Sequence, residues 1–218
     1  MSIFYRFCQA LTWLQVSLLT RWRAQGRNNI PREGPVIVVA NHMNLLDIPL
    51  LSASLNRQAI YMTKEELFQN WLSGYLLRHL DAFPVHRGQL DRTALRRALQ
   101  ALSKGNLLAI FPEGTRSRNG QLQPAFAGAA LIALHSGAPI LPAGITGTEK
   151  AKGKAWILRH PRIAIKFGIP FYPPTTNQRV TKKDMADLTE SIMRHIAELL
   201  PPEYHGYYAQ EKGPKSED

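Results

Sequence analysis

Short apolar runs alternate with helix-like stretches along most of this chain. The runs are rich in aliphatic and β-branched residues, which predicts strands, and the stretches between them repeat apolar residues every three or four positions, as helices do. Strands are predicted at residues 36–40, 59–63, 82–86, 107–111, 140–145 and 163–167, and helices at residues 48–55, 65–80, 92–104, 125–135 and 182–200. This alternation predicts an α/β fold with a mostly parallel central sheet flanked by helices.

The helix predicted over residues 92–104 has the clearest end signals. Asp91 can accept a hydrogen bond from its first turn, and Gly105 can close its last turn. Leu95 and Leu102 lie seven positions apart and therefore share a face. We expect this face to pack against the sheet.

The N-terminal residues form an amphipathic pattern with arginines near its ends. Apolar residues recur at three- and four-residue steps from Ile3 to Trp22. A helix packed on the core would show this stripe, and so would a helix in a lipid interface. The apolar run over residues 10–20 contains polar side chains and is shorter than the roughly 20 residues that cross a bilayer. We therefore predict an N-terminal amphipathic, membrane-facing helix within residues 1–29.

Composition adds a strong positive charge. Lysine and arginine total 27 against 16 acidic residues, a formal charge of +11, which favours phosphate head groups, anionic bilayers or nucleic acid as partners. Cys8 is the only cysteine, which excludes an intramolecular disulfide. A length of 218 residues suits one domain. We expect an α/β domain over residues 30–200 and a C-terminal tail over residues 201–218.

The segment NHMNLLD follows the first predicted strand, at a position where open α/β sheets place ligand sites. It puts His42 at the strand end and Asp47 where it can cap the next helix. In a continuous helix, residues five apart point about 140° away from each other, so this pair can meet only across a turn. A carboxylate on one imidazole nitrogen leaves the other free to take a proton from a hydroxyl. Alone, a histidine and an aspartate at this spacing are more often structural than catalytic.

The segment FPEGTRS follows a second predicted strand and carries Glu113, Gly114, Thr115 and Arg116 in a turn-prone setting. Arginine can hold a phosphate with two parallel hydrogen bonds, and glycine lets the backbone approach a ligand. A surface turn with a Glu–Arg ion pair is the alternative.

Two other predicted strands also end in cations, Lys64 in MTKEEL and Arg87 in FPVHRG. With Arg116 they fall at the same predicted edge as His42, which predicts an anion site beside the base. The sequence has no HExxH zinc motif and no GxSxG serine elbow, and we predict no metal site.

The segments NHMNLLD, FPVHR, FPEGTRS and ILPAGITG, in this order, resemble the four blocks of the glycerolipid acyltransferases, the family of lysophosphatidic acid acyltransferase. The resemblance runs from about Pro35 to Gly147. It implies that an acyl group passes from acyl-coenzyme A or acyl-carrier protein to a glycerol-phosphate hydroxyl without a covalent acyl-enzyme. The implied activity is that of a 1-acylglycerol-3-phosphate O-acyltransferase, which makes phosphatidic acid for phospholipid biosynthesis. The thioester is a substrate, and no bound cofactor is expected.

The resemblance also implies roles for residues at matching positions. His42 would be the base, and Asp47 would orient it. The remaining matches bind the acceptor: its glycerol portion by Glu113, Gly114 and Thr115, and its phosphate by Arg87 and Arg116, with Lys64 as a weaker match. The sequence departs from the family at Asn44, where serine is common, and near Asp81, where glycine is common.

Other functions stay open at this point. The same blocks suit acylation of another lysolipid, such as a lyso-ornithine lipid or a lysophospholipid. A non-catalytic protein that binds nucleic acid or membrane would explain the charge but not the ordered blocks. We expect a lysophospholipid acceptor, an acyl thioester donor and an anionic membrane surface as partners, and we do not expect nucleic acid. The expected location is peripheral or monotopic, on the cytoplasmic face of the inner membrane.

Overall fold

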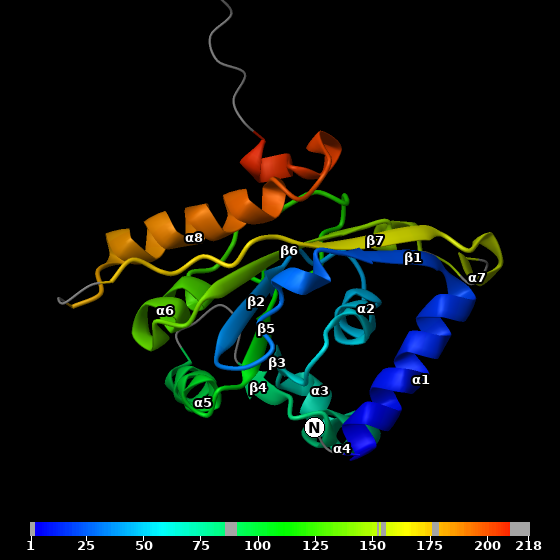
Figure 1. Cartoon of the computed structure of the whole chain (residues 1–218), viewed down its shortest axis with the longest axis horizontal. Helices are drawn as coiled ribbons and strands as arrows, with labels where there is room; N and C mark the ends of the chain where they lie inside the picture. The colour runs from blue at the N-terminus through cyan, green and yellow to red at the C-terminus, as the bar shows by residue number, and fades with distance from the viewer. Residues whose placement is uncertain (1–2, 86–90, 152, 154–155, 176–178, 210–218) are drawn as a thin grey trace, which may run out of the picture.

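The apolar runs of the sequence form the centre of a seven-stranded sheet in a computed structural model that describes residues 3–85, 91–151, 153, 156–175 and 179–209 (Figure 1). The strands are β1 (Arg21–Gln25), β2 (Val36–Ala40), β3 (Ala59–Lys64), β4 (Phe83–Val85), β5 (Leu107–Ile110), β6 (Ile140–Thr146) and β7 (Arg162–Phe167). The α-helices are α1 (Ile3–Leu19), α2 (Asp47–Ser54), α3 (Glu66–Gln69), α4 (Trp71–His79), α5 (Arg92–Ser103), α6 (Gly128–Ser136), α7 (Trp156–Arg159) and α8 (Lys182–Ala197). Short 3-10 helices are Arg27–Asn29, Thr148–Lys150, Pro202–Tyr204 and Gly206–Tyr208.

The sheet has the strand order β1-β7-β6-β2-β5-β3-β4. Its strand pairs are parallel except β6 with β7. Every residue of β2 is buried, as expected for a strand covered on both faces. Since β2, β3 and β5 run in the same direction, the segments that follow them meet at one edge of the sheet. The predicted mostly parallel α/β architecture is confirmed.

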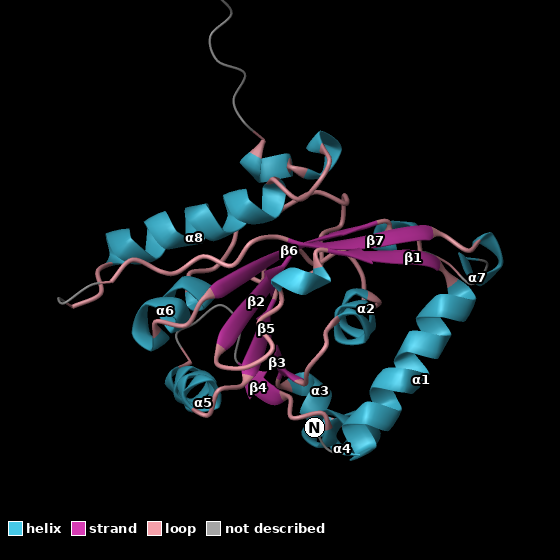
Figure 2. Ribbon diagram, in the orientation of Figure 1, coloured by secondary structure: helices cyan, strands magenta, loops and turns pink. Residues whose placement is uncertain are grey.

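Helices cover both faces of the sheet (Figure 2). On one face, α5, α6 and α8 pack on the side chains of Ile37, Leu108 and Ile140. On the other face, α1 and α2 pack on the alternate side chains of the central strands and on Ile163 and Ile165 of β7. The two sets of helices therefore cover alternate side chains of the same strands, because successive side chains of a strand point to opposite faces of the sheet.

The predicted end signals of α5 are confirmed. The Asp91 carboxylate accepts a hydrogen bond from the backbone N–H of Ala94 at 2.9 Å. Gly105 follows the helix with a φ of 75°, a left-handed conformation that glycine adopts without strain. Capping groups at both ends explain why the predicted bounds of this helix agree closely with the observed ones.

The structure corrects the N-terminal prediction. The helix ends at Leu19, and Arg21–Gln25, expected within the helical segment, is strand β1 paired in parallel with β7. Its side chains alternate between exposed and half-buried, with Trp22 and Ala24 packed against the core. From the sequence, these residues look like a continuation of the helix. Five residues are too few to distinguish the 3.6-residue period of a helix from the two-residue period of a strand. Only the partner strand makes the extended form favourable.

A second correction concerns residues 65–80, where one helix was predicted and two are present. The chain is extended at Asn70, between α3 and α4. The Asn70 side-chain oxygen accepts a hydrogen bond from the backbone N–H of Ser73 at 3.2 Å, as a residue that starts a helix does. Asparagine competes for backbone hydrogen bonds in this way, which explains the break.

Asp81, which stands near a position where glycine is common in the resembling family, has a φ of 56°. This left-handed conformation explains the preference for glycine, and aspartate is one of the few other residues that tolerate it. The Asp81 carboxylate also accepts a hydrogen bond from the side chain of Gln58. The turn before β4 therefore forms even though Asp81 replaces the more common glycine.

Candidate active site

His42 and Asp47 are in contact at the carboxyl end of β2. The His42 Nδ1 atom lies 2.8 Å from Asp47 Oδ2. The imidazole stacks on the ring of Phe111, with ring centroids 4.3 Å apart. Its other nitrogen, Nε2, has no hydrogen-bond partner among the described residues, and the residue is 6% exposed. The turn that the five-residue separation requires is therefore present, and one imidazole nitrogen remains available to a substrate.

Asp47 holds the turn together as well as the imidazole. Besides His42, its Oδ2 atom accepts hydrogen bonds from the backbone N–H groups of Met43, at 2.6 Å, and Asn44, at 2.7 Å. The carboxylate is completely buried. The predicted cap is wrong, because Asp47 lies in the first turn of α2 and its side chain points back to the preceding loop. The Asn44 side chain accepts from the N–H of Leu46 instead, at 3.1 Å.

Asn41 anchors the start of this loop and was not singled out from the sequence. Its side-chain N–H donates to the carbonyl of Ile145 at 2.8 Å, and its side-chain oxygen accepts from the N–H of Ile145 at 2.7 Å. The loop of residues 41–47, here called the His42 loop, is thus tied to β6 on one side. The only feature of the sequence that points to Asn41 is its position as a polar residue directly after an apolar strand.

Glu113 ties the His42 loop to the segment after β5. Its Oε1 atom accepts from the backbone N–H of His42 at 2.8 Å, and its Oε2 atom accepts from the N–H of Gln123 at 2.9 Å. The N–H of Ser117 donates to the His42 carbonyl at 2.8 Å, which forms a second link. Glu113 is 1% exposed, so its carboxylate faces the protein backbone in this structure. We infer that it positions His42 and that any contact with an acceptor comes from its neighbours.

The environment of Glu113 favours its neutral form. Burial raises the pKa of its carboxyl to about 7, and the charge of Asp47 adds to this, while the two backbone N–H donors act in the opposite direction. The folded protein therefore keeps a proton that the unfolded chain releases above pH 4.5. The free energy of unfolding contributed by Glu113 accordingly falls as the pH rises from 4.5 to about 7.

Replacing Glu113 by glutamine is expected to destabilise the protein more at pH 5 than at pH 7.5. The amide has one acceptor oxygen, so one of the two backbone N–H groups is left unpaired, at a cost of about 1–3 kcal/mol. The variant also lacks the titrating group that stabilises the wild type at low pH. Denaturant unfolding at both pH values measures this. The exposed Glu198→Gln should change neither value, and an equal effect of Glu113→Gln at both pH values would contradict the argument.

Three residues predicted to bind the acceptor lie on the same segment as Glu113. Gly114 has a φ of 63°, and a Cβ atom there would lie 2.8 Å from the Phe126 ring, so this turn needs glycine. Thr115 and Arg116 are exposed and directly precede Ser117, which contacts the His42 loop. The structure thus brings this segment to the His42 loop.

The structure places only one of the other two predicted anion ligands, Lys64 and Arg87. Lys64 is the last residue of β3 and is exposed at the carboxyl edge of the sheet. Arg87 lies outside the described residues. Within the described residues, no group of three or more His, Cys, Asp or Glu side chains is placed to hold a metal ion.

An apolar cavity of about 230 Å³ lies beside the His42 loop. Leu46 and Pro49 line it from the loop and α2, Val16 and Leu19 line it from α1, and Trp156 lines it from α7. Two of its lining residues, Leu46 and Pro49, flank the buried Asp47 in the sequence. An alkyl chain suits such a lining, because apolar surface is then removed from water on both partners.

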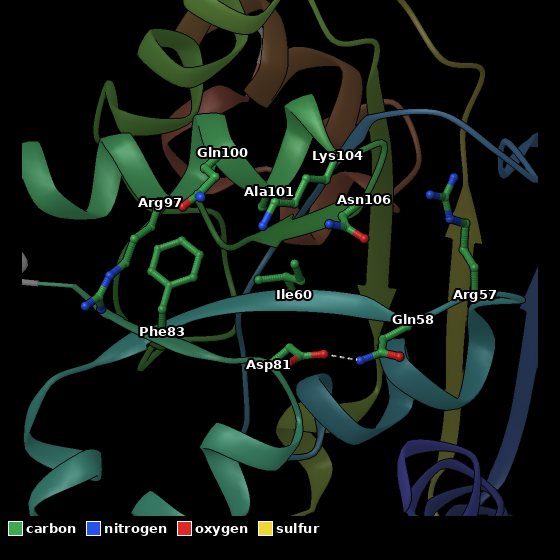
Figure 3. A pocket seen from close by; sticks show the side chains of 10 residues that line it. All are labelled: Arg57, Gln58, Ile60, Asp81, Phe83, Arg97, Gln100, Ala101, Lys104 and Asn106. Carbon is green, nitrogen blue, oxygen red and sulfur yellow. Dashed lines mark hydrogen bonds between the residues drawn. The ribbon is translucent and has the colours of Figure 1, made fainter. Parts of the chain in front are cut away.

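A larger cavity, of about 530 Å³, lies at the opposite edge of the sheet (Figure 3). Its walls come from α5 and from the amino ends of β3, β4 and β5, and they include Arg57, Phe83, Arg97 and Lys104. Arg57 donates to the backbone carbonyls of Pro31, Gly34 and Gly105. None of the predicted site residues lines this cavity.

Comparisons with known proteins identify the family of this chain. A profile of the family described as Acyltransferase matches residues 21–146, more than half of the chain. The chain is 28% identical to the 1-acyl-sn-glycerol-3-phosphate acyltransferase of Bacillus subtilis, over 89% of this chain and 96% of that protein. It is 32% identical to the chloroplastic 1-acyl-sn-glycerol-3-phosphate acyltransferase BAT2 of Brassica napus, over 78% of this chain but 51% of that longer protein.

A solved structure shows a similar fold. The crystal structure of the 1-acyl-sn-glycerophosphate (LPA) acyltransferase PlsC from Thermotoga maritima superimposes with a TM-score of 0.69 and 26% identity. The match covers 89% of this chain and 79% of that chain. The similarity therefore extends over most of the α/β fold.

Proposed function

This chain belongs to the acyltransferase family of the 1-acyl-sn-glycerol-3-phosphate acyltransferases, and we propose that it acylates the free hydroxyl of lysophosphatidic acid to give phosphatidic acid. The donor is an acyl thioester, either acyl-coenzyme A or acyl-carrier protein. The observation that carries the proposal is the contact of 2.8 Å between His42 and Asp47 at the end of β2, inside the matched region. This pair supplies the base that an alcohol nucleophile needs.

His42 acts as the general base in the proposed mechanism. Its Nε2 atom takes the hydroxyl proton as the hydroxyl oxygen forms a bond with the thioester carbonyl carbon. The carbon–sulfur bond then breaks, and the imidazolium returns the proton to the departing thiolate. Asp47, on Nδ1, keeps that nitrogen protonated and stabilises the positive ring. The acyl group passes directly to the acceptor, and no acyl-enzyme forms.

The acceptor phosphate is held by cations at the same sheet edge. Arg116 and Lys64 are exposed there, and Arg87 is assigned the same role from the sequence. Anchoring the phosphate keeps the hydroxyl near His42 and lowers the entropic part of the barrier. Gly114 and Thr115 contribute the surface against the glycerol portion.

Replacing Arg116 by glutamine is expected to raise KM for lysophosphatidic acid about 10- to 100-fold, with a smaller change in kcat. Loss of charge-assisted hydrogen bonds to a phosphate accounts for this size. Initial rates at varied acceptor concentration measure it. Arg118→Gln makes the same charge change two residues away on the same exposed segment and should leave KM unchanged. Equal effects of the two substitutions would show that only overall charge matters.

The apolar face of α1 lies on the membrane in this proposal. Large apolar side chains of α1 are exposed, including Phe7, Leu11, Leu14 and Leu18. Tyr5 and Val16, on its other face, are buried against the domain. Among the described residues, no helix is both long and apolar enough to span a bilayer. We infer a peripheral location, with α1 in the interface. Deleting residues 1–24 would also remove most of β1, so point substitutions test this better.

A panel of acceptors and donors tests the proposed function. Purified protein is given labelled acyl-coenzyme A or acyl-carrier protein with lysophosphatidic acid, a lyso-ornithine lipid or another lysophospholipid. We expect transfer to lysophosphatidic acid with at least one donor. Transfer only to another lysolipid would assign the chain to a different acceptor, and no transfer to any acceptor would reject the proposal.

A further inference from the structure

Large apolar side chains are also exposed on α7 and on the His42 loop, which together with α1 line the apolar cavity. Leu158 of α7 is 84% exposed, Ile157 is 42% exposed, and Leu45, between His42 and Asp47, is 62% exposed. A soluble surface rarely places several large aliphatic side chains in water at one location without a partner. These three side chains are called the α7 patch.

The residues next to the α7 patch in the sequence, Leu46 and Trp156, line the apolar cavity. Trp156, the first residue of α7, lines this cavity together with Leu19 of α1 and Leu46 of the His42 loop. The side chain of Asn44 donates to the carbonyl of Ala151, in the segment before α7, at 3.3 Å. In Figure 1, α7 is near the end of α1 that leads into β1. The helices α1 and α7 and the His42 loop therefore meet around this one cavity.

The connection from α7 to the sheet is short. His160 has a φ of 42° and turns the chain directly from α7 towards β7. The carbonyl of the next residue, Pro161, accepts from the N–H of Arg21 at 3.0 Å. The position of α7 relative to β1 and β7 is thus set by a tight turn. Such a helix can present its exposed side chains at a fixed place.

The surroundings of the α7 patch are positively charged. Arg159 is exposed at the end of α7, and Arg162 and Arg21 are exposed and face each other across β7 and β1. Residues 156–167 contain no acidic side chain. Apolar side chains bordered by cations match the surface of a bilayer that contains anionic lipids, where the cations contact the head groups.

We propose that the α7 patch is a second membrane contact, which inserts into an anionic bilayer and holds the His42 loop at its surface. The benefit of this contact rests on the proposed function. A lysolipid in the bilayer surface would reach His42 through the opening between α1 and α7 without entering water. The two contacts differ in role. α1 supplies most of the buried apolar area, and α7 sets the orientation of the catalytic residues relative to the bilayer.

The double substitution Ile157→Ser with Leu158→Ser tests this. We expect binding of the full chain to phosphatidylcholine vesicles that contain phosphatidylglycerol to weaken about 100-fold, as loss of two inserted aliphatic side chains predicts. Acylation of lysophosphatidic acid embedded in these vesicles should fall similarly. Acylation of a short-chain, water-soluble lysophosphatidic acid should stay unchanged. Vesicle sedimentation does not depend on turnover, so its result stands even if the acceptor proposal fails.

Matched variants complete the test. Ile169→Ser removes an equally exposed aliphatic side chain that follows β7 and should leave vesicle binding unchanged. Leu14→Ser with Leu18→Ser, on α1, serves as the positive control. Wild-type vesicle binding by the double α7 variant would overturn the proposal. So would a dimeric wild type that becomes monomeric in this variant with vesicle binding intact, because the patch would then join two copies of the chain.

Discussion

Replacing His42 by alanine is expected to lower kcat for acyl transfer about 10²- to 10⁴-fold, the range for loss of a positioned general base. The acceptor hydroxyl then has no group to take its proton, since Nε2 of this imidazole is the nitrogen left open at the sheet edge. KM should change little because the phosphate anchors remain. Initial rates with labelled acyl donor and varied lysophosphatidic acid measure both constants.

A histidine on the surface provides the control for this substitution. His135 is exposed on α6, where its ring contacts the carbonyl of Leu131, so His135→Ala should keep full activity. Thermal unfolding of both variants shows whether the loss of activity comes from loss of fold. Retained acyl transfer by folded His42→Ala would reject the mechanism. Loss of transfer with vesicle binding intact would exclude a purely membrane-binding protein.

Replacing Asp47 by asparagine is expected to lower kcat about 10²-fold or more. Asp47 Oδ2 accepts from His42 Nδ1 and from the N–H groups of Met43 and Asn44, and the carboxylate is completely buried. Asparagine can offer its oxygen to these three donors, but it cannot offer the charge that stabilises the imidazolium. Its N–H₂ group would then occupy a buried position that has no acceptor.

The measurement separates catalysis from stability. Because asparagine has nearly the same shape as aspartate, the variant should fold, and unfolding in denaturant should show a loss of about 1–3 kcal/mol for the unpaired amide. Asp187→Asn, at an exposed position of α8, should alter neither kcat nor stability. A folded Asp47→Asn protein with wild-type kcat would show that the carboxylate only shapes the loop.

Local patterns in the sequence were sufficient for most of the sheet. The apolar run that became β2 is buried along its whole length, and such runs depend on burial rather than on a particular partner. The ends of α5 were also predictable, because Asp91 and Gly105 act on neighbouring residues. In contrast, β1 and α7 were missed. Each is five residues long or shorter, and each owes its conformation to neighbouring elements that lie far away in the sequence.

The candidate site divides in the same way. The sequence by itself determined that His42 follows an apolar strand and that Asp47 can meet it only across a turn. Both statements depend on residues within a few positions of each other. Only the tertiary structure decided what Glu113 does. It lies 71 residues from His42 in the chain, and its carboxylate binds the backbone of His42 rather than facing solvent. The apolar opening between α1, α7 and the His42 loop was equally out of reach of the sequence, since it exists only where three separate segments pack together.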